Sequence, residues 1–401
     1  MLFGIDRRSV VKRKIKQMLK KLILIQYRMM TKILPIRKNV NVFQSSVGRN
    51  YTGNPKSIYE AMVEKKLDEK FRCYYILDNP NQRIPGKGKT VRNSRFFYYY
   101  LMAVAGVWIS DARFPNYIIK RKGVTFLQTW HGTPLKKLAL DMDSLSMADE
   151  GTLEDYKENF RKSSKTWDYL IAQNKFSADI FKRAFDFHGK ILPIGYPRND
   201  VLFKGNTLDH IIELKSKLRL PMDKKILLYA PTWRDDSYYD KSSYKFVSPL
   251  DFSKVKEALS DDYIMIVKYH YMVKECIDWS IYEGFYRVFD NSYDISDLYL
   301  VSDMLITDYS SVMFDYSLLK RPMLFYAYDL EQYKNILRGF YFDFEKEAPG
   351  PIFSTTDEFI WNVKNYEPSI YKEKYDDFEK KYHLYERGNA GEQVIQLLSS
   401  L

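Results

Sequence analysis

The sequence predicts an α/β protein built from two Rossmann-like domains that follow a basic amphipathic helix. Short apolar runs that end in polar loops alternate with helical stretches, which is the pattern of a mostly parallel sheet covered on both faces. The alternation begins near residue 40, is interrupted by a Gly-Pro loop at 195–197, and then starts again. The chain has 401 residues, of which 45% are hydrophobic and 16% aromatic, so it can fill two large cores.

Residues 1–38 form the first predicted unit, a basic arm. They carry twelve Lys and Arg residues and one acid, Asp6, so the arm holds nearly all of the net charge of +12. Its apolar residues recur every three or four positions, which predicts one stripe of a helix. These residues are Val11, Ile15, Met18, Leu19, Leu22, Ile25, Met29, Met30 and Ile33.

We expect this arm to lie on an anionic membrane face as a peripheral membrane-binding helix. The alternative is a surface helix that packs on its own domain and keeps its basic side in solvent. No run approaches the ~20 apolar residues that a membrane span needs. Because the rest of the chain is nearly neutral, the charge distribution argues against a nucleic-acid groove, and nucleic acid is not an expected partner.

The cysteines and the known motifs argue against metals and cofactors. Cys73 and Cys276 form no CxxC pair, so we predict neither a disulfide framework nor a zinc site. The sequence contains no HExxH, EF-hand, GxGxxG or Walker motif. We interpret the acids of Asp141-Met142-Asp143 and Asp235-Asp236 as solvated side chains rather than metal ligands.

The remaining chain divides into a first Rossmann-like domain at 39–190 and a second at 191–401. In the first, we expect strands at 40–44, 73–77, 107–110, 124–129, 169–172 and 191–194, the last at the boundary, and helices at 54–66, 142–166 and 177–187. In the second, we expect strands at 226–230, 263–267, 304–307 and 322–327. Helices are expected at 297–301, from about residue 311 to 319, and within 356–401.

Polar side chains follow four of these strands. They are His131; Thr232 and Arg234; Lys268 and His270; and Asp308, Ser310 and Ser311. Because the C-terminal ends of parallel strands converge on one crevice, we expect these groups to meet although they are far apart in sequence. Together they would form a phosphate site with two imidazoles.

His131 and His270 are the candidate catalytic residues, since each closely follows an apolar strand and an imidazole titrates near neutral pH. We interpret His188, His210 and His383 as structural.

Three cations are candidate phosphate ligands, namely Arg198, Arg234 and Lys268. For each of them the alternative is a surface salt bridge. Ser310 and Ser311 begin a predicted helix whose free amides can bind phosphate, unless they form an ordinary N-cap. Asp315 either reaches a ribose hydroxyl or is an exposed helix acid.

Five motifs, taken in order, resemble the CDP-glycerol glycerophosphotransferases of wall teichoic acid synthesis. The resemblance runs from about residue 40 to 350, and the combination is specific although each motif alone is not. One departure is Tyr271, which stands where the family often has proline. The motifs are Trp130–Lys136, Gly195–Asp200, Ala230–Arg234, Lys268–His270 and Thr307–Asp315.

The resemblance implies a GT-B-like fold in which the first domain takes an undecaprenyl-diphosphate-linked saccharide acceptor and the second binds CDP-glycerol. It also implies peripheral attachment to the cytoplasmic side of the cell membrane. The donor contacts that it implies are Trp130, His131, Gly132, Thr133, Pro134, Arg198, Pro231, Thr232, Lys268, Tyr269, His270, Ser310, Ser311 and Asp315.

The expected reaction is transfer of glycerol phosphate to an acceptor hydroxyl, with attack on the β-phosphorus of CDP-glycerol and release of CMP. His131 would act as the base, and His270, Arg198 and Lys268 would stabilise the developing charge. The alternatives are a CDP-ribitol or nucleotide-sugar transferase of the same fold, a capsule polymer as product, or a non-catalytic membrane-binding module. Primases and polymerases share these motifs; the absence of an obvious extra N-terminal domain favours transfer of one or few units.

Overall fold

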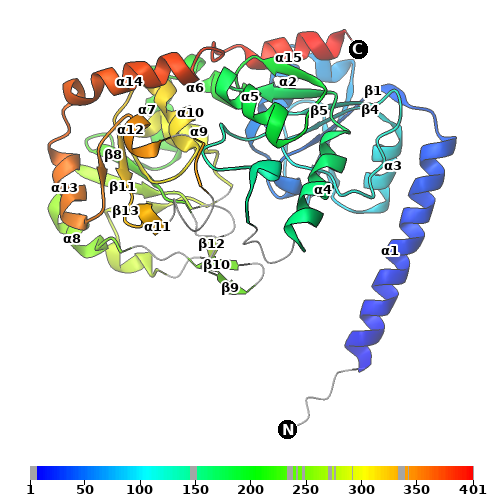
Figure 1. Cartoon of the computed structure of the whole chain (residues 1–401), viewed down its shortest axis with the longest axis horizontal. Coiled ribbons are helices and arrows are strands. Elements are labelled where there is room, and N and C mark those ends of the chain that lie inside the picture. Colours follow the sequence, from blue (N-terminus) through cyan, green and yellow to red (C-terminus); the bar gives the residue numbers. More distant parts are fainter. Residues whose placement is uncertain are drawn as a thin grey trace.

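Two parallel sheets, each covered by helices, make up the body of the protein (Figure 1). The structure is a computed structural model. It describes residues 7–144, 151–232, 238–240, 243–245, 249–269, 273–274, 277–290, 292–332, 339–341 and 343–400.

The first sheet has seven strands in the order β3-β2-β1-β4-β5-β6-β7, and all neighbouring pairs are parallel. Its strands are mostly buried, as expected for a sheet covered on both faces. The strands are β1 (Arg37–Gln44), β2 (Arg72–Leu77), β3 (Lys89–Arg92), β4 (Ala105–Ser110), β5 (Thr125–Gln128), β6 (Tyr169–Ala172) and β7 (Lys190–Pro193). The helices of this half are α2 (Gly53–Glu64), α3 (Phe96–Val104), α4 (Leu153–Ser164) and α5 (Lys175–Ala184).

The second sheet has six parallel strands in the order β13-β11-β8-β14-β15-β16. They are β8 (Lys225–Ala230), β11 (Tyr263–Val267), β13 (Tyr286–Val288), β14 (Met304–Thr307), β15 (Met323–Tyr326) and β16 (Ile352–Phe353). A small separate sheet contains β9 (Tyr238–Asp240), β10 (Ser243–Lys245) and β12 (Val273–Lys274).

The helices that follow β7 include short ones near the domain boundary and longer ones at the C-terminal end. They are α6 (Asp200–Lys204), α7 (Leu208–Lys217), α8 (Phe252–Leu259), α9 (Ile295–Val301), α10 (Val312–Tyr316), α11 (Leu330–Gln332), α12 (Phe344–Glu347), α13 (Thr356–Lys364), α14 (Pro368–Tyr382) and α15 (Ala390–Ser399). Two apolar clusters of the second half lie on the two faces of its sheet, as alternate residues of β8 show: Ile226 and Leu228 belong to one cluster, and Leu227 to the other.

The division between the two halves differs from the sequence-based boundary at 190/191. Residues Lys190–Pro193 form β7, which pairs with β6 in the first sheet. Helix α15 also returns to the first half, where Val394 and Leu398 pack in the same core as Ile58 of α2. Figure 1 shows this helix, in red, lying beside α2. The amphipathic face of α15 predicts a buried helix, but it does not identify the domain that buries it.

Helix α1 (Arg7–Ile33) confirms the predicted helix and extends past the body of the protein (Figure 1). One face packs on the first half: Tyr27 is fully buried and contacts Tyr99, and its hydroxyl accepts a hydrogen bond of 2.8 Å from Ile119 N. The other face remains exposed through Met18, Leu19, Leu22, Ile25, Met29 and Ile33. Within the described part of the chain, no helix has the length and apolarity needed to cross a membrane.

Candidate active site

The C-terminal edges of the two sheets meet at a loop between β5 and α4 and at the start of α10. The two edges approach closely at Gly132, where a Cβ atom would lie 2.9 Å from Ser311 Oγ. Any side chain at this position would force Ser311 or the loop to shift. Residues that follow β5, β6, β7 and β14 contribute side chains to this place. The meeting of the four predicted groups, which follow β5, β8, β11 and β14, stays a prediction.

His131 is held in a defined orientation at the end of β5. Trp130 has a left-handed backbone (φ 52°), and its ring stacks on the His131 ring with the centroids 4.5 Å apart. His131 Nδ1 lies 2.8 Å from the backbone oxygen of Asp111. Because a carbonyl oxygen only accepts hydrogen bonds, neutral His131 carries its proton on Nδ1 and keeps the lone pair on Nε2. The geometry thus provides a base at Nε2.

The surroundings of His131 favour its neutral form. Solvent reaches the side chain, yet protein atoms surround it closely enough that desolvation lowers the pKa below the ordinary value of 6.5. The Arg198 guanidinium lowers this pKa further, whereas the hydrogen bond to Asp111 opposes the shift. The imidazole can therefore act as a proton acceptor at neutral pH.

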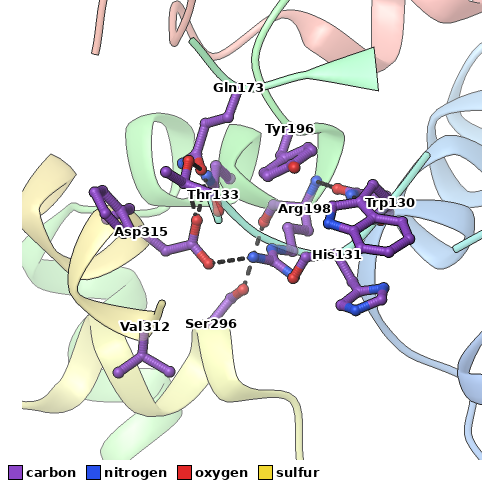
Figure 2. A network of polar contacts seen from close by, with 12 residues as sticks. Trp130, His131, Thr133, Gln173, Tyr196, Arg198, Ser296, Val312 and Asp315 are labelled. Carbon is purple, nitrogen blue, oxygen red and sulfur yellow. Dashed lines mark hydrogen bonds and ion pairs between the residues drawn. The ribbon is translucent and has the colours of Figure 1, made fainter. Parts of the chain in front are cut away.

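Arg198 and Asp315 link this loop to the second sheet (Figure 2). Arg198 Nη1 donates to His131 O at 2.8 Å, and its Nη2 lies 2.5 Å from Asp315 Oδ2. Asp315 Oδ1 accepts from Gln173 Nε2 at 3.0 Å and from Asn199 Nδ2 at 2.9 Å. Since Asp315 is 2% exposed, the alternative of an exposed helix acid is wrong. The predicted ribose contact of Asp315 remains a prediction.

The residues after His131 lie inside the same network. Thr133 is buried; its hydroxyl donates to Gln173 Oε1 at 2.6 Å and accepts from Asn174 Nδ2 at 2.9 Å. Gly132 and Pro134 are also buried. Among the predicted donor contacts of this loop, His131 is the one whose side chain is exposed.

On the second half, a hydrogen bond of 2.9 Å from Thr232 N to Asp308 Oδ1 joins the loops after β8 and β14. Pro231 is buried. Ser310 and Ser311 are half-buried at the start of α10, and Ser311 is its N-cap residue without a side-chain capping bond. The predicted helix start after Asp308 is thus confirmed.

Lys268 follows β11, with half-buried Tyr269 next to it. Its ammonium group donates to the backbone oxygens of Asp290 and, at 3.1 Å, Tyr293. Desolvation lowers the pKa of Lys268 to about 8, against the opposing charges of Asp290 and Asp294. The predicted site residues Arg234 and His270 lie outside the described residues, as do Tyr271 and Asp235-Asp236.

Asp141 and His383 both have defined side-chain contacts. Asp141 is not a solvated acid, because it forms an ion pair with Arg183 and accepts from Tyr341 Oη at 2.8 Å. His383 binds Ser317 Oγ at 2.7 Å, and burial lowers its pKa to about 4. In the described ranges, no group of three or more His, Cys, Asp or Glu side chains is arranged to hold a metal ion.

Sequence reasoning missed four residues of the network: Asn54, Gln173, Asn199 and Glu386. Glu386 Oε1 accepts from Asn199 Nδ2 at 2.8 Å and from Tyr196 N at 3.1 Å, and burial raises the pKa of Glu386 to about 8. Gln173 and Asn199 stand beside strand ends or in the Gly-Pro loop, where a polar residue could have been singled out. Glu386 follows no strand, and its sequence context carried no such signal.

Comparison with known proteins gives one consistent family. Residues 25–400 match the family model of CDP-glycerol:poly(glycerophosphate) glycerophosphotransferase. The teichoic acid poly(glycerol phosphate) polymerase of Bacillus subtilis is 43% identical over 98% of this chain, which spans only 53% of that protein. The teichoic acid glycerol-phosphate transferase of Staphylococcus aureus is 38% identical over 97% of this chain and 100% of its own length.

A solved structure agrees with these relatives. The wall teichoic acid polymerase TagF, after a 15-minute soak with CDPG, superimposes with a TM-score of 0.89 at 37% identity, covering 100% of this chain and 98% of that chain. The resemblance seen in the five motifs is thereby confirmed over nearly the whole chain. The protein belongs to the CDP-glycerol:poly(glycerophosphate) glycerophosphotransferase family.

Proposed function

We propose that the protein transfers glycerol phosphate from CDP-glycerol to a hydroxyl of an undecaprenyl-diphosphate-linked saccharide acceptor in wall teichoic acid biosynthesis, with release of CMP. The observation that carries this proposal is His131, whose Nε2 is free to accept a proton beside Arg198 and the start of α10. The names of the related transferases and the CDPG soak of TagF support the choice of donor.

The reaction starts at the acceptor hydroxyl. Nε2 of neutral His131 takes the proton while the hydroxyl oxygen attacks the β-phosphorus, and the bond from that phosphorus to CMP breaks. The diphosphate gains charge near the oxygen that leaves, so nearby cations and amides stabilise the transition state. We assign this task to Arg198, Lys268, His270 and the Ser310–Ser311 helix start.

The two halves would share the substrates in a GT-B-like manner. The acceptor approaches from the first half, which carries His131, and the donor lies on the second half, which carries Lys268, Ser310 and Ser311. Asp315 and Thr232 belong to the same side as the donor.

We also propose that α1 attaches the protein to the cytoplasmic face of the cell membrane, where a lipid-linked acceptor lies. The exposed apolar face of α1 and its lysines support this role. Since Tyr27 packs in the core, deletion of the arm would damage the fold. Replacing Met18, Leu22 and Ile25 by serine is a cleaner change, because all three are exposed.

The donor and the base are tested together. Purified full-length protein is mixed with a lipid-linked acceptor and with CDP-glycerol, CDP-ribitol or a nucleotide sugar, and nucleotide release is followed. We expect CMP from CDP-glycerol, and His131→Ala to lower turnover by ~10²–10⁴-fold. His188→Ala is the matched control, because His188 is exposed and contacts Asp186. Preference for another donor, or normal turnover of the His131 variant, would refute the proposal.

Membrane attachment is tested separately by sedimentation with anionic vesicles. The serine variant of Met18, Leu22 and Ile25 should lose vesicle binding but still release CMP with a soluble acceptor analogue. Unchanged vesicle binding would contradict the role of α1. If the intact protein bound vesicles and released no nucleotide with any acceptor or donor, the non-catalytic membrane module would be the better hypothesis.

A further inference from the structure

Asn54, in the first turn of α2, contacts two loops of the candidate active site, the loop after β5 and the Gly-Pro loop after β7. The residue is 1% exposed. Its Nδ2 donates to the backbone oxygen of Trp130 at 3.0 Å and to that of Thr129 at 3.4 Å. Its Oδ1 accepts from Arg198 N at 3.1 Å. All three partners lie outside its own helix.

An asparagine at a helix start usually caps that helix, but Asn54 does not. The N-cap position of α2 is Thr52, and the Asn54 side chain forms hydrogen bonds with the β5 loop and with the Gly-Pro loop. Capping therefore does not explain why a buried asparagine is needed here.

The contacts of Asn54 close a ring of hydrogen bonds around His131. Trp130 is left-handed, which is a strained conformation for a residue other than glycine and persists only where neighbours hold it. Asn54 binds the oxygen of this residue, and Arg198 Nη1 binds the oxygen of the next one, His131. The ring closes because the backbone N–H of Arg198 donates to Asn54 Oδ1.

We propose that Asn54 is a positioning residue for the transfer reaction, which fixes the direction of the His131 ring and holds the Arg198 guanidinium beside it. This inference rests on the proposed function. Without the Asn54 amide, the Trp130 oxygen keeps its hydrogen bond from the neighbouring Thr129 hydroxyl but loses the donor from α2, so the left-handed turn can relax. The backbone of Arg198 loses its anchor at the same time.

Three charged groups lie near this ring of hydrogen bonds and bear on the protonation of His131. Arg198 lowers the pKa of His131, and Asp315 neutralises part of the Arg198 charge. Asp111 lies on the other side, and burial raises the pKa of its carboxyl to about 7. If Arg198 moves away, the pKa of His131 should rise toward its ordinary value. Because Asp111 titrates in a similar range, the imidazole itself has to be observed.

The test compares Asn54→Ala with wild type and with Ser57→Ala. Ser57 lies on the same helix, and its hydroxyl donates to Gly53 O of that helix at 3.3 Å, so it is a matched control for loss of a polar side chain from α2. The full-length proteins are labelled at histidine, and the ring of His131 is titrated by NMR. The pH dependence of kcat with CDP-glycerol is measured on the same samples.

For Asn54→Ala we expect a kcat lower by ~10²-fold, from misplacement of the base, and an upward shift of the His131 titration and of the acidic limb of kcat. Ser57→Ala should change neither the His131 titration nor the acidic limb of the kcat profile. A folded Asn54→Ala protein with the wild-type His131 titration would overturn the inference, whatever its kcat. If alanine prevents folding, Asn54→Ser, which is too short to reach both loops, is judged by the same criteria.

The NMR titration separates this inference from the proposed function. If wild type releases no CMP, the function fails, yet the titration still shows whether Asn54 controls His131.

Discussion

The two sides of the candidate active site are held in different ways. On the first half, the oxygens of Trp130 and His131 and the Nδ1 atom of His131 all have hydrogen-bond partners from other elements. On the second half, Lys268 is bound to backbone oxygens of a neighbouring loop, and Ser311 makes no capping bond with its side chain.

The difference separates catalysis from donor binding. The base is positioned before any substrate arrives, so the protein has already supplied the free energy that orders it. The ammonium group of Lys268, in contrast, must exchange a carbonyl partner for a phosphate oxygen when the donor binds. Changes on the first half should therefore lower turnover or stability, and changes on the second half should weaken the affinity for CDP-glycerol.

The strongest way to break this arrangement is to remove Asp315, the carboxylate that joins the two sides. Asp315→Ala leaves the Arg198 guanidinium without the carboxylate that balances its charge, which should cost ~3–5 kcal/mol of the free energy of unfolding. Denaturant unfolding measures this loss. The control is Asp179→Ala, which removes an exposed ion pair with Lys175 and should cost ~0.5 kcal/mol or less. Equal losses in the two variants would contradict the importance of the buried pair.

Gly132→Ala tests the closeness of the two edges. The added methyl group would lie 2.9 Å from Ser311 Oγ and 3.3 Å from its Cβ, so the Ser311 side chain must turn or the edges must separate. Either change disturbs the predicted donor contact, and turnover should fall by ~10²-fold. Adding Ser311→Gly makes room for this methyl group. Turnover of the double variant should therefore return to the level of Ser311→Gly alone. If Gly132→Ala turned over normally, this contact would not matter for the reaction.

The pH dependence of donor binding tests whether Lys268 is a donor ligand. Its lowered pKa of about 8 means that the ammonium loses its charge, and its attraction for a diphosphate, as pH rises through that value. We expect the Kd for CDP-glycerol to rise about tenfold for each pH unit above this pKa, at most. Calorimetry on Lys268→Arg, which stays protonated, should give a flat profile over the same range. A flat profile in wild type would exclude Lys268 as a donor ligand.

The smallest expected effect is at the Lys56–Asp294 ion pair between α2 and the N-cap of α9. The pair is 2.8 Å long and partly exposed, with 21% and 14% of the two side chains accessible. Lys56→Met should cost ~1 kcal/mol of stability, less than the loss at Asp315. A loss of stability as large as that of Asp315→Ala would show that the partly exposed Lys56–Asp294 pair stabilises the protein as much as the buried Arg198–Asp315 pair does.

The sequence predicted the parts of the fold and site that depend on local pattern. Strands β6, β11 and β14 have the predicted bounds because each is a short apolar run followed at once by polar residues. His131 was found for the same reason. The sequence predicts a helix from residue 142, but α4 begins at Leu153. Thr152 and Asp155 form a capping box at this start, and this pair of residues is visible in the sequence.

Other features depend on contacts between distant segments. The run Phe96–Val104 is apolar all round and gave no helical stripe, although it forms α3. The partners of Asp315 come from the loop after β6 and from the Gly-Pro loop, over a hundred residues away. The sequence predicts a helix start at Asn54, which agrees with α2 to within one residue, but the side-chain partners of Asn54 appear only in the folded protein.

Hydrogen–deuterium exchange with and without CDP-glycerol tests most directly whether both edges form one donor site. The full-length His131→Ala variant is used so that the donor is not consumed. With CDP-glycerol bound, we expect slower exchange in two segments, 129–137 on the first half and 307–316 on the second. Protection of only one of these segments, or protection only elsewhere in the chain, would contradict a site shared by the two halves.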